Sequence, residues 1–151
     1  MKLTTLPRKL RRFWSLPRAE RRDLLDATRA LVSARLSVWR TPLGDLIDRE
    51  SGDEARLPCP EPEESERVGL AVNRIANNVP FGATCLVRSL AIQNVFRSRG
   101  LSPGEIKVGV RMHAGDFEAH AWVLQGDLLV GDEPARVARF TEVSDLRAVR
   151  F

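Results

Sequence analysis

The chain has few cysteines and no long apolar run. Its 151 residues include only Cys59 and Cys85, too few for a disulfide framework, and neither lies in a Cys-x-x-Cys or Cys/His cluster suited to zinc. We therefore expect no metal or other cofactor and a reducing compartment, the cytoplasm. No stretch approaches the ~20 apolar residues of a transmembrane helix, and the basic N-terminus leads into no signal-peptide core. We expect no membrane partner.

Composition and charge favour a globular protein that does not bind nucleic acid. Hydrophobic residues make up 43% and charged residues 29% of the chain, and its length suffices for one compact domain. The basic excess is N-terminal, because residues 1–50 carry 12 basic and 6 acidic side chains, whereas residues 51–68 carry 2 and 6. The N-terminal arginines are interleaved with Leu, Ala and acidic residues, as on a solvated helix face, and no nucleic-acid-binding motif is present.

Three segments are expected within this domain. Residues 1–50 form a basic helical segment, residues 51–66 an acidic, proline-rich connector, and residues 67–151 the core that carries the chemistry. Residues 18–40 contain no Gly or Pro and predict a long amphipathic helix that covers the core rather than docking a partner. Its expected inward positions are Leu24, Ala27, Leu31, Ala34 and Val38. A second helix is predicted over 63–77, with Val68, Ala71, Val72 and Ile75 facing inward.

The third predicted helix begins at a cysteine. Thr84 can cap its start, and Gly100 can close its end. Cys85 then falls in the first turn, where unpaired backbone N–H groups and the positive end of the helix dipole favour a thiolate, and Arg88 could add a cation nearby. Cys59 lies between two prolines and is expected to be exposed and not the nucleophile.

Beyond Gly100 the apolar period changes from helical to alternating. Residues 106–112, 117–124 and 128–130 predict three strands, and residues 137–143 a fourth. The fold class is therefore α+β, with N-terminal helices and the Cys85 helix packed on an antiparallel meander.

Two further residues complete a set suited to thiol chemistry. His120 lies inside the second strand, and Asp132 follows the third. A three-residue loop at 125–127 would set His120 directly opposite Asp132 on one face, whereas a two-residue loop at 126–127 would pair His120 with Glu133 and reverse Asp132. We expect the longer loop or an equivalent bulge, and Gly126 suits either.

In that geometry the three side chains form a catalytic triad. Cys85 is the nucleophile, His120 the general base and acid, and Asp132 the group that orients the imidazole. The Cys85 N–H can help to bind the oxyanion, with Asn78 a speculative partner. Each residue also has a plainer interpretation: Cys85 as core, His120 as a structural hydrogen-bonding group and Asp132 as a turn former. Trp122 either walls the site or fills the core.

The chain resembles a known family at these residues. The runs Cys85-Leu86-Val87-Arg88-Ser89-Leu90-Ala91, Lys107 to Arg111, Ala119-His120-Ala121-Trp122-Val123 and Gly131-Asp132 are similar to the leader peptidases of lasso-peptide biosynthesis. These are a transglutaminase-like branch of the papain-like cysteine hydrolases. The resemblance implies a triad of Cys85, His120 and Asp132 that cleaves the leader from a ribosomally made precursor peptide, so that a lasso cyclase can close the core peptide.

The resemblance also implies partners. Residues before position 18 leave no room for the strand-rich leader-recognition domain of fused family members. We therefore expect the stand-alone peptidase of a split system, which depends on a separate leader-recognition protein. Two alternatives stay open from the residues: a transglutaminase-like acyltransferase that uses the same thiol, and a non-catalytic scaffold that binds a peptide at a sheet edge.

Overall fold

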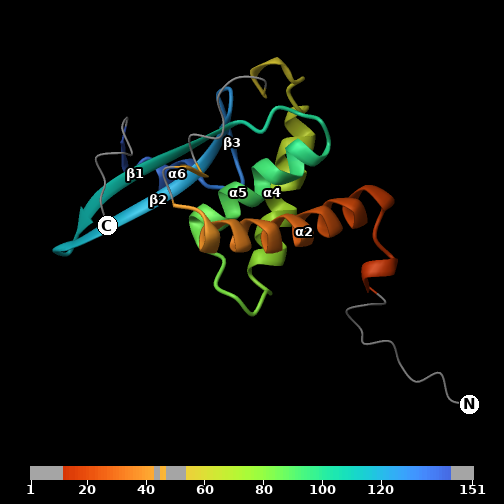
Figure 1. Cartoon of the computed structure of the whole chain (residues 1–151), viewed down its shortest axis with the longest axis horizontal. Coiled ribbons are helices and arrows are strands. Elements are labelled where there is room, and N and C mark those ends of the chain that lie inside the picture. The colour runs from red at the N-terminus through yellow and green to blue at the C-terminus, as the bar shows by residue number, and fades with distance from the viewer. Residues whose placement is uncertain (1–11, 43–44, 47–53, 144–151) are drawn as a thin grey trace, which may run out of the picture.

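The computed structural model describes residues 12–42, 45–46 and 54–143. Parts of the predicted basic segment and connector, and the basic stretch Met1–Arg8, lie outside these residues. In chain order the elements are α2 (Arg18–Arg40), η1 (Glu54–Arg56), α4 (Pro62–Ala76), α5 (Cys85–Ser98), β1 (Glu105–His113), β2 (Asp116–Gln125), β3 (Leu128–Val130), α6 (Pro134–Val137) and β4 (Thr141–Glu142). The predicted α+β class is confirmed, with the helices packed against a four-stranded antiparallel sheet (Figure 1).

The two helices that flank α5 follow the predicted patterns. The bounds of α2 match the prediction, and α4 begins and ends one residue earlier than expected. The apolar stripe of α2 is buried against α4 and α5, so this helix covers the core as expected. Of the expected inward residues, only Val38 and Ile75 are partly exposed, and both still pack against the core.

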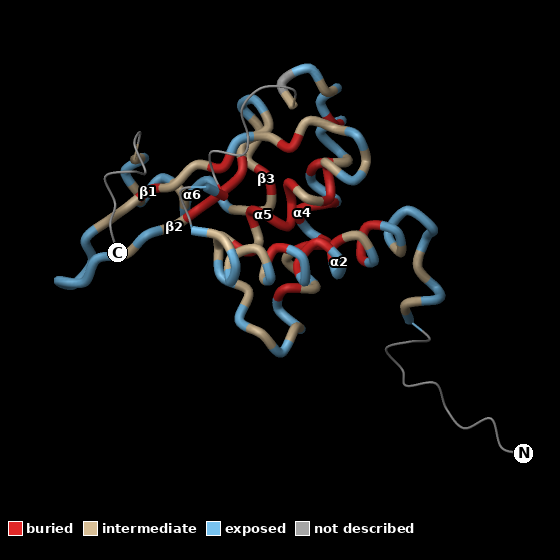
Figure 2. Tube along the Cα trace, viewed as in Figure 1, coloured by how far each residue is buried: buried red, intermediate tan, exposed pale blue. Residues whose placement is uncertain are grey.

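Helix α5 is the central helix of the molecule. Thr84 caps its start, because its Oγ1 accepts a hydrogen bond from the Val87 N–H, 3.4 Å away. Gly100 follows its end with φ +69°, the left-handed conformation that glycine adopts after a helix. Buried residues cluster where α2, α4 and α5 meet the base of β2, whereas the far end of the β1–β2 hairpin is exposed (Figure 2).

The sheet differs from the predicted meander at its last strand. Strands β1, β2 and β3 follow one another as expected, but the strand order is β3-β2-β1-β4. The chain therefore crosses back to the other edge of the sheet after β3. Residues 137–143 were expected to form one strand; the structure has α6 over Pro134–Val137 and a two-residue β4. Pro134 accounts for the helical turn, since proline is favoured in the first turn of a helix.

No helix in the described part of the chain is both long and apolar enough to cross a bilayer.

Candidate active site

Cys85 is the first residue of α5, as the sequence predicts. The N–H groups of Cys85 and Leu86 occupy the first two helical positions, where the helix itself supplies no acceptor. They are therefore available to an anion, and the positive end of the helix dipole adds to the attraction. The Cys85 side chain is partly exposed, and Cys59 is exposed, as expected for a cysteine between prolines.

Arg88 and Asn78 have hydrogen-bond partners that the sequence did not predict. Arg88 donates to the Ala83 carbonyl, to Asn73 Oδ1 and to Asn77 Oδ1, at 3.0, 3.0 and 2.9 Å. Its guanidinium is thus held between the start of α5 and the face of α4. Asn78, the speculative oxyanion partner, follows α4 and donates to the Arg74 carbonyl in the last turn of that helix. It does not line the cavity that holds Cys85.

His120 and Asp132 are in direct contact. His120 Nε2 lies 2.5 Å from Asp132 Oδ2, and the two side chains are only 13% and 10% exposed. The other carboxylate oxygen, Oδ1, accepts the Glu133 N–H at 2.8 Å, which fixes the carboxylate plane. Because a carboxylate only accepts hydrogen bonds, Nε2 donates in this contact, which leaves Nδ1 as the ring nitrogen that can exchange a proton. Nδ1 is therefore the ring atom that can take a proton from a thiol.

The route to this contact is not the predicted one. Gln125 pairs with Leu128, so the loop has two residues, Gly126 and Asp127, and the expected three-residue loop is wrong. Gly126 has φ +59°, as glycine has at the first position of a type II′ turn. In that register a continued strand would point Asp132 to the wrong face.

Gly131 removes this difficulty. The ladder ends at Val130, and Gly131 takes φ +71°, which turns the chain out of the strand and aims Asp132 at His120. A Cβ at position 131 would also lie 2.8 Å from Ile92 Cδ1, so any other residue there would have to displace the end of that side chain. Gly131 therefore directs Asp132 to the face of His120, the role that a bulge was expected to have.

Aromatic rings fix the His120 imidazole. The Trp122 and Phe140 ring centroids lie 6.1 and 5.1 Å from that of His120. Trp122 is 5% exposed and lines the cavity, so it both walls the site and fills the interior. Gly109, opposite His120 on β1, leaves space for both rings, because a Cβ there would lie 2.8 Å from Phe140 Cβ and from Trp122 Cη2.

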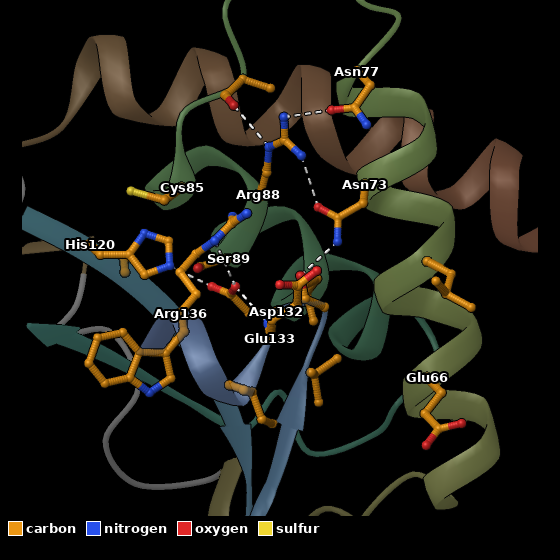
Figure 3. Close-up of a pocket in the computed structure, with 18 residues that line it drawn as sticks. Glu66, Asn73, Asn77, Cys85, Arg88, Ser89, His120, Asp132, Glu133 and Arg136 are labelled. Atoms are coloured by element: carbon orange, nitrogen blue, oxygen red, sulfur yellow. Dashed lines mark hydrogen bonds and ion pairs between the residues drawn. The ribbon is translucent and has the colours of Figure 1, made fainter. Parts of the chain in front are cut away.

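Cys85, His120, Trp122 and Asp132 line one open cavity of about 980 Å³ (Figure 3). Cys85 and His120 lie at the same end of it in Figure 3, and Asp132 is beside His120. One wall is a single face of α4 and its cap, formed by Glu66, Leu70, Asn73 and Asn77, so the cleft follows the helix for ~16 Å at ~1.5 Å per residue. That length accommodates roughly five residues of extended chain at ~3.3 Å each. Among the described residues, no group of three His, Cys, Asp or Glu side chains could hold a metal ion.

Several residues of this site were not predicted from the sequence. They are Phe140, Asn73 on α4 and Asn77 at the C-cap of α4. The spacing of the asparagines, four residues apart on one helix face, was the only local signal for them.

A thiol at a helix start, sharing a cavity with a His–Asp pair borne by an antiparallel sheet, characterises cysteine-dependent hydrolases and acyltransferases. The chain belongs to the transglutaminase-like superfamily, whose family model matches residues 27–145, well over half of its length. This confirms the broader part of the resemblance found in the sequence. No curated protein and no solved structure gave a significant match.

Proposed function

We propose that the chain is a cysteine peptidase that removes the leader from a ribosomally synthesised lasso precursor peptide. The observation that carries the peptidase part is the His120–Asp132 hydrogen bond in a cavity shared with Cys85, in a member of the transglutaminase-like superfamily. The cleft along α4, long enough for about five extended residues, supports a peptide substrate. The lasso assignment is supported by the Cys-Leu-x-Arg-Ser-Leu and Ala-His-Ala-Trp runs.

The proposed reaction passes through a thioester. The Cys85 thiol gives its proton to His120 Nδ1, and the thiolate attacks the scissile carbonyl carbon. The N–H groups at the start of α5 stabilise the oxyanion, while Asp132 stabilises the imidazolium. Collapse breaks the C–N bond, and His120 returns the proton to the leaving amine, which becomes the N-terminus of the core peptide. Water, deprotonated by His120, then attacks the thioester carbonyl carbon. The C–S bond breaks, His120 returns the proton to the Cys85 sulfur, and the leader leaves as a carboxylic acid.

Partners follow from this assignment. A separate leader-recognition protein delivers the precursor, and a lasso cyclase uses the freed amine. The test is to incubate the chain with a candidate lasso precursor and a candidate leader-recognition protein and to measure the product masses. We expect cleavage at one peptide bond, with fragment masses that sum to the precursor plus one water, and no cleavage of a precursor whose leader is scrambled. An intact precursor in the complete mixture would overturn the peptidase proposal.

The superfamily match also supports acyl transfer, because the same thioester can react with an amine instead of water. Adding a primary amine to the mixture separates the two reactions. A leader fragment that carries the amine at its new C-terminus, in place of the free acid, would assign the chain as a transferase.

Replacing Asp132 by asparagine is expected to lower kcat by about 10³–10⁴-fold while the protein stays folded. The amide would present an N–H or a neutral oxygen to His120 Nε2, which disfavours the required tautomer and removes the charge that stabilises the imidazolium. Cleavage rates and thermal unfolding should be measured together. Asp127→Asn, in the exposed turn before β3, is the matched control and should keep full activity.

A further inference from the structure

A chain of hydrogen bonds joins the start of α5 to the loop that carries Asp132. Arg88 donates to the Ala83 carbonyl, two residues before Cys85, and to Asn73 Oδ1 on α4. Asn73 Nδ2 then donates to the Gly131 carbonyl, 2.7 Å away, in the peptide unit that precedes Asp132 (Figure 3). Asn73 therefore connects the segment that carries Cys85, through Arg88, with the segment that carries Asp132, through Gly131. It forms no hydrogen bond with Cys85 or Asp132 themselves in this chain of contacts.

We propose that Asn73, oriented by Arg88, is a positioning residue that sets Asp132 relative to Cys85. The orientation of the Asn73 amide follows from its neighbours, since its oxygen must face the Arg88 cation and its NH₂ group must then face the Gly131 carbonyl. This deepens the proposed function and rests on it, because it assigns Asn73 to the assembly of the same thiol site.

The Asp132 loop needs such a support because the sheet ladder has ended. Val130 is the last paired residue of β3, so no strand in the described part of the chain pairs with Gly131 or Asp132. Helix α4 takes over this role at two points. Gly69 approaches so closely that a Cβ there would lie 2.7 Å from the Gly131 nitrogen, and Asn73, one turn on, holds the Gly131 carbonyl. Steric contact and hydrogen bond together fix the peptide unit that aims Asp132.

Asn77 provides a matched control for Asn73. Both asparagines accept a hydrogen bond from the Arg88 guanidinium through Oδ1, but only Asn73 also donates to Gly131. An aspartate at either position keeps the acceptor for Arg88 and adds one negative charge. At position 73 alone it removes the donor and sets a carboxylate oxygen against the Gly131 carbonyl, which is repulsive.

Alkylation of Cys85 by iodoacetamide tests the proposal without a peptide substrate. The full chain is treated at pH 6 and pH 9, and the modification of Cys85 and of exposed Cys59 is followed separately by mass spectrometry. An ordinary thiol is only about 0.3% thiolate at pH 6, so fast reaction at that pH reports a thiolate held by an imidazolium. Wild-type Cys85 is expected to react at least tenfold faster than Cys59 at pH 6.

Asn73→Asp is expected to lower the Cys85 rate at pH 6 by about tenfold, whereas Asn77→Asp should stay within twofold of the wild type. At pH 9, where thiols ionise unaided, the three proteins should converge, and Cys59 should not change in any of them. Asn73→Ser, which adds no charge and is too short to reach Gly131, should lower the pH 6 rate in the same direction. If Asn73→Asp fails to fold, this second variant decides the question.

The outcomes separate the inference from the proposed function. If Cys85 outpaces Cys59 at pH 6 but the folded Asn73 variants match Asn77→Asp, Asn73 has no positioning role and the inference is overturned. If wild-type Cys85 reacts no faster than Cys59, the thiol site itself is wrong and the proposed function falls with the inference. A role in stability alone would lower the unfolding temperature without changing the ratio of the pH 6 and pH 9 rates.

Discussion

Replacing Cys85 by alanine is expected to abolish cleavage of the precursor peptide, with a loss of about 10⁶-fold in kcat. That loss corresponds to removing the nucleophile of a triad hydrolase, which leaves only the contribution of the oxyanion site and of substrate binding. The fold should survive, because alanine is a good helix former at the start of α5 and Thr84 still caps the helix. Product masses over a long incubation, with thermal unfolding of both proteins, provide the measurement.

Cys59→Ser is the matched control for this experiment. Cys59 is the other cysteine of the chain, it is exposed, and it does not line the cavity. Serine there should leave the cleavage rate unchanged. If Cys85→Ala still cleaves the precursor, or if both variants lose the same fraction of the cleavage rate, Cys85 is not the nucleophile and the proposed mechanism is wrong.

The helices that frame the site could be predicted because their signals are local. Thr84 and Gly100 mark the ends of α5 through a side-chain cap and a left-handed residue, and both do so in the structure. The apolar period of α2 was equally informative, since each inward position lies three or four residues from the next. These features placed Cys85 at a helix start without any knowledge of the tertiary fold.

The register of the β2–β3 hairpin could not be predicted in the same way. Leu128, Leu129 and Val130 are all apolar, so no alternation identifies the inward face, and Gly126 suits a loop of either length. The rule that one residue of slip reverses a side chain holds only while the strand continues. Here the strand stops at Val130, and the positive φ of Gly131 restores the aim of Asp132.

The hydrogen bonds through which α4 holds the Asp132 loop could not be predicted from the sequence. The Asn73–Gly131 hydrogen bond spans 58 residues, and the Arg88–Asn73 bond spans 15. Neither bond has a spacing that helix or strand geometry makes special. The position of Arg88, one turn after Cys85, suggested a cation near the thiolate. The sequence did not reveal that its guanidinium donates hydrogen bonds to Asn73 and Asn77. Long-range polar contacts of this kind are decided by the packing of helices, which one sequence does not reveal.

The three helices are joined on their far side by a buried charge cluster. Arg99, just after α5, pairs with Asp23 and Asp26 of α2 and with Glu64 of α4, at N–O distances of 2.7, 2.8 and 2.8 Å. The Arg99 and Asp23 side chains are each only 5% exposed. Burial acts to lower the pKa of Arg99, but the hydrogen bonds that Arg99 donates to the three carboxylates outweigh it and raise that pKa above its ordinary value. Arg99 is therefore charged at neutral pH, where its pairing contributes to stability.

Replacing Arg99 by methionine is therefore expected to lower the free energy of unfolding by about 3–5 kcal/mol, the usual cost of breaking a buried ion pair by removing one partner. Most of this cost arises because Asp23 stays buried and, among the described residues, keeps only Arg67, 44% exposed, as an ion-pair partner. Chemical denaturation of the wild type and the variant at pH 7 provides the measurement. A loss of this size is a large part of the stability of a small domain.

Arg67→Met is the matched control, because Arg67 donates to the same carboxylate from the surface, at 3.2 Å. Exposed ion pairs are worth about 0–1 kcal/mol, so this variant should lose no more than that. Arg99→Lys should fall between the two, since an ammonium keeps the charge but cannot present the fork of donors that meets three carboxylates at once. Equal losses for Arg99→Met and Arg67→Met would show that the cluster does not anchor α5 to α2 and α4, and that apolar packing alone holds the nucleophile helix in place.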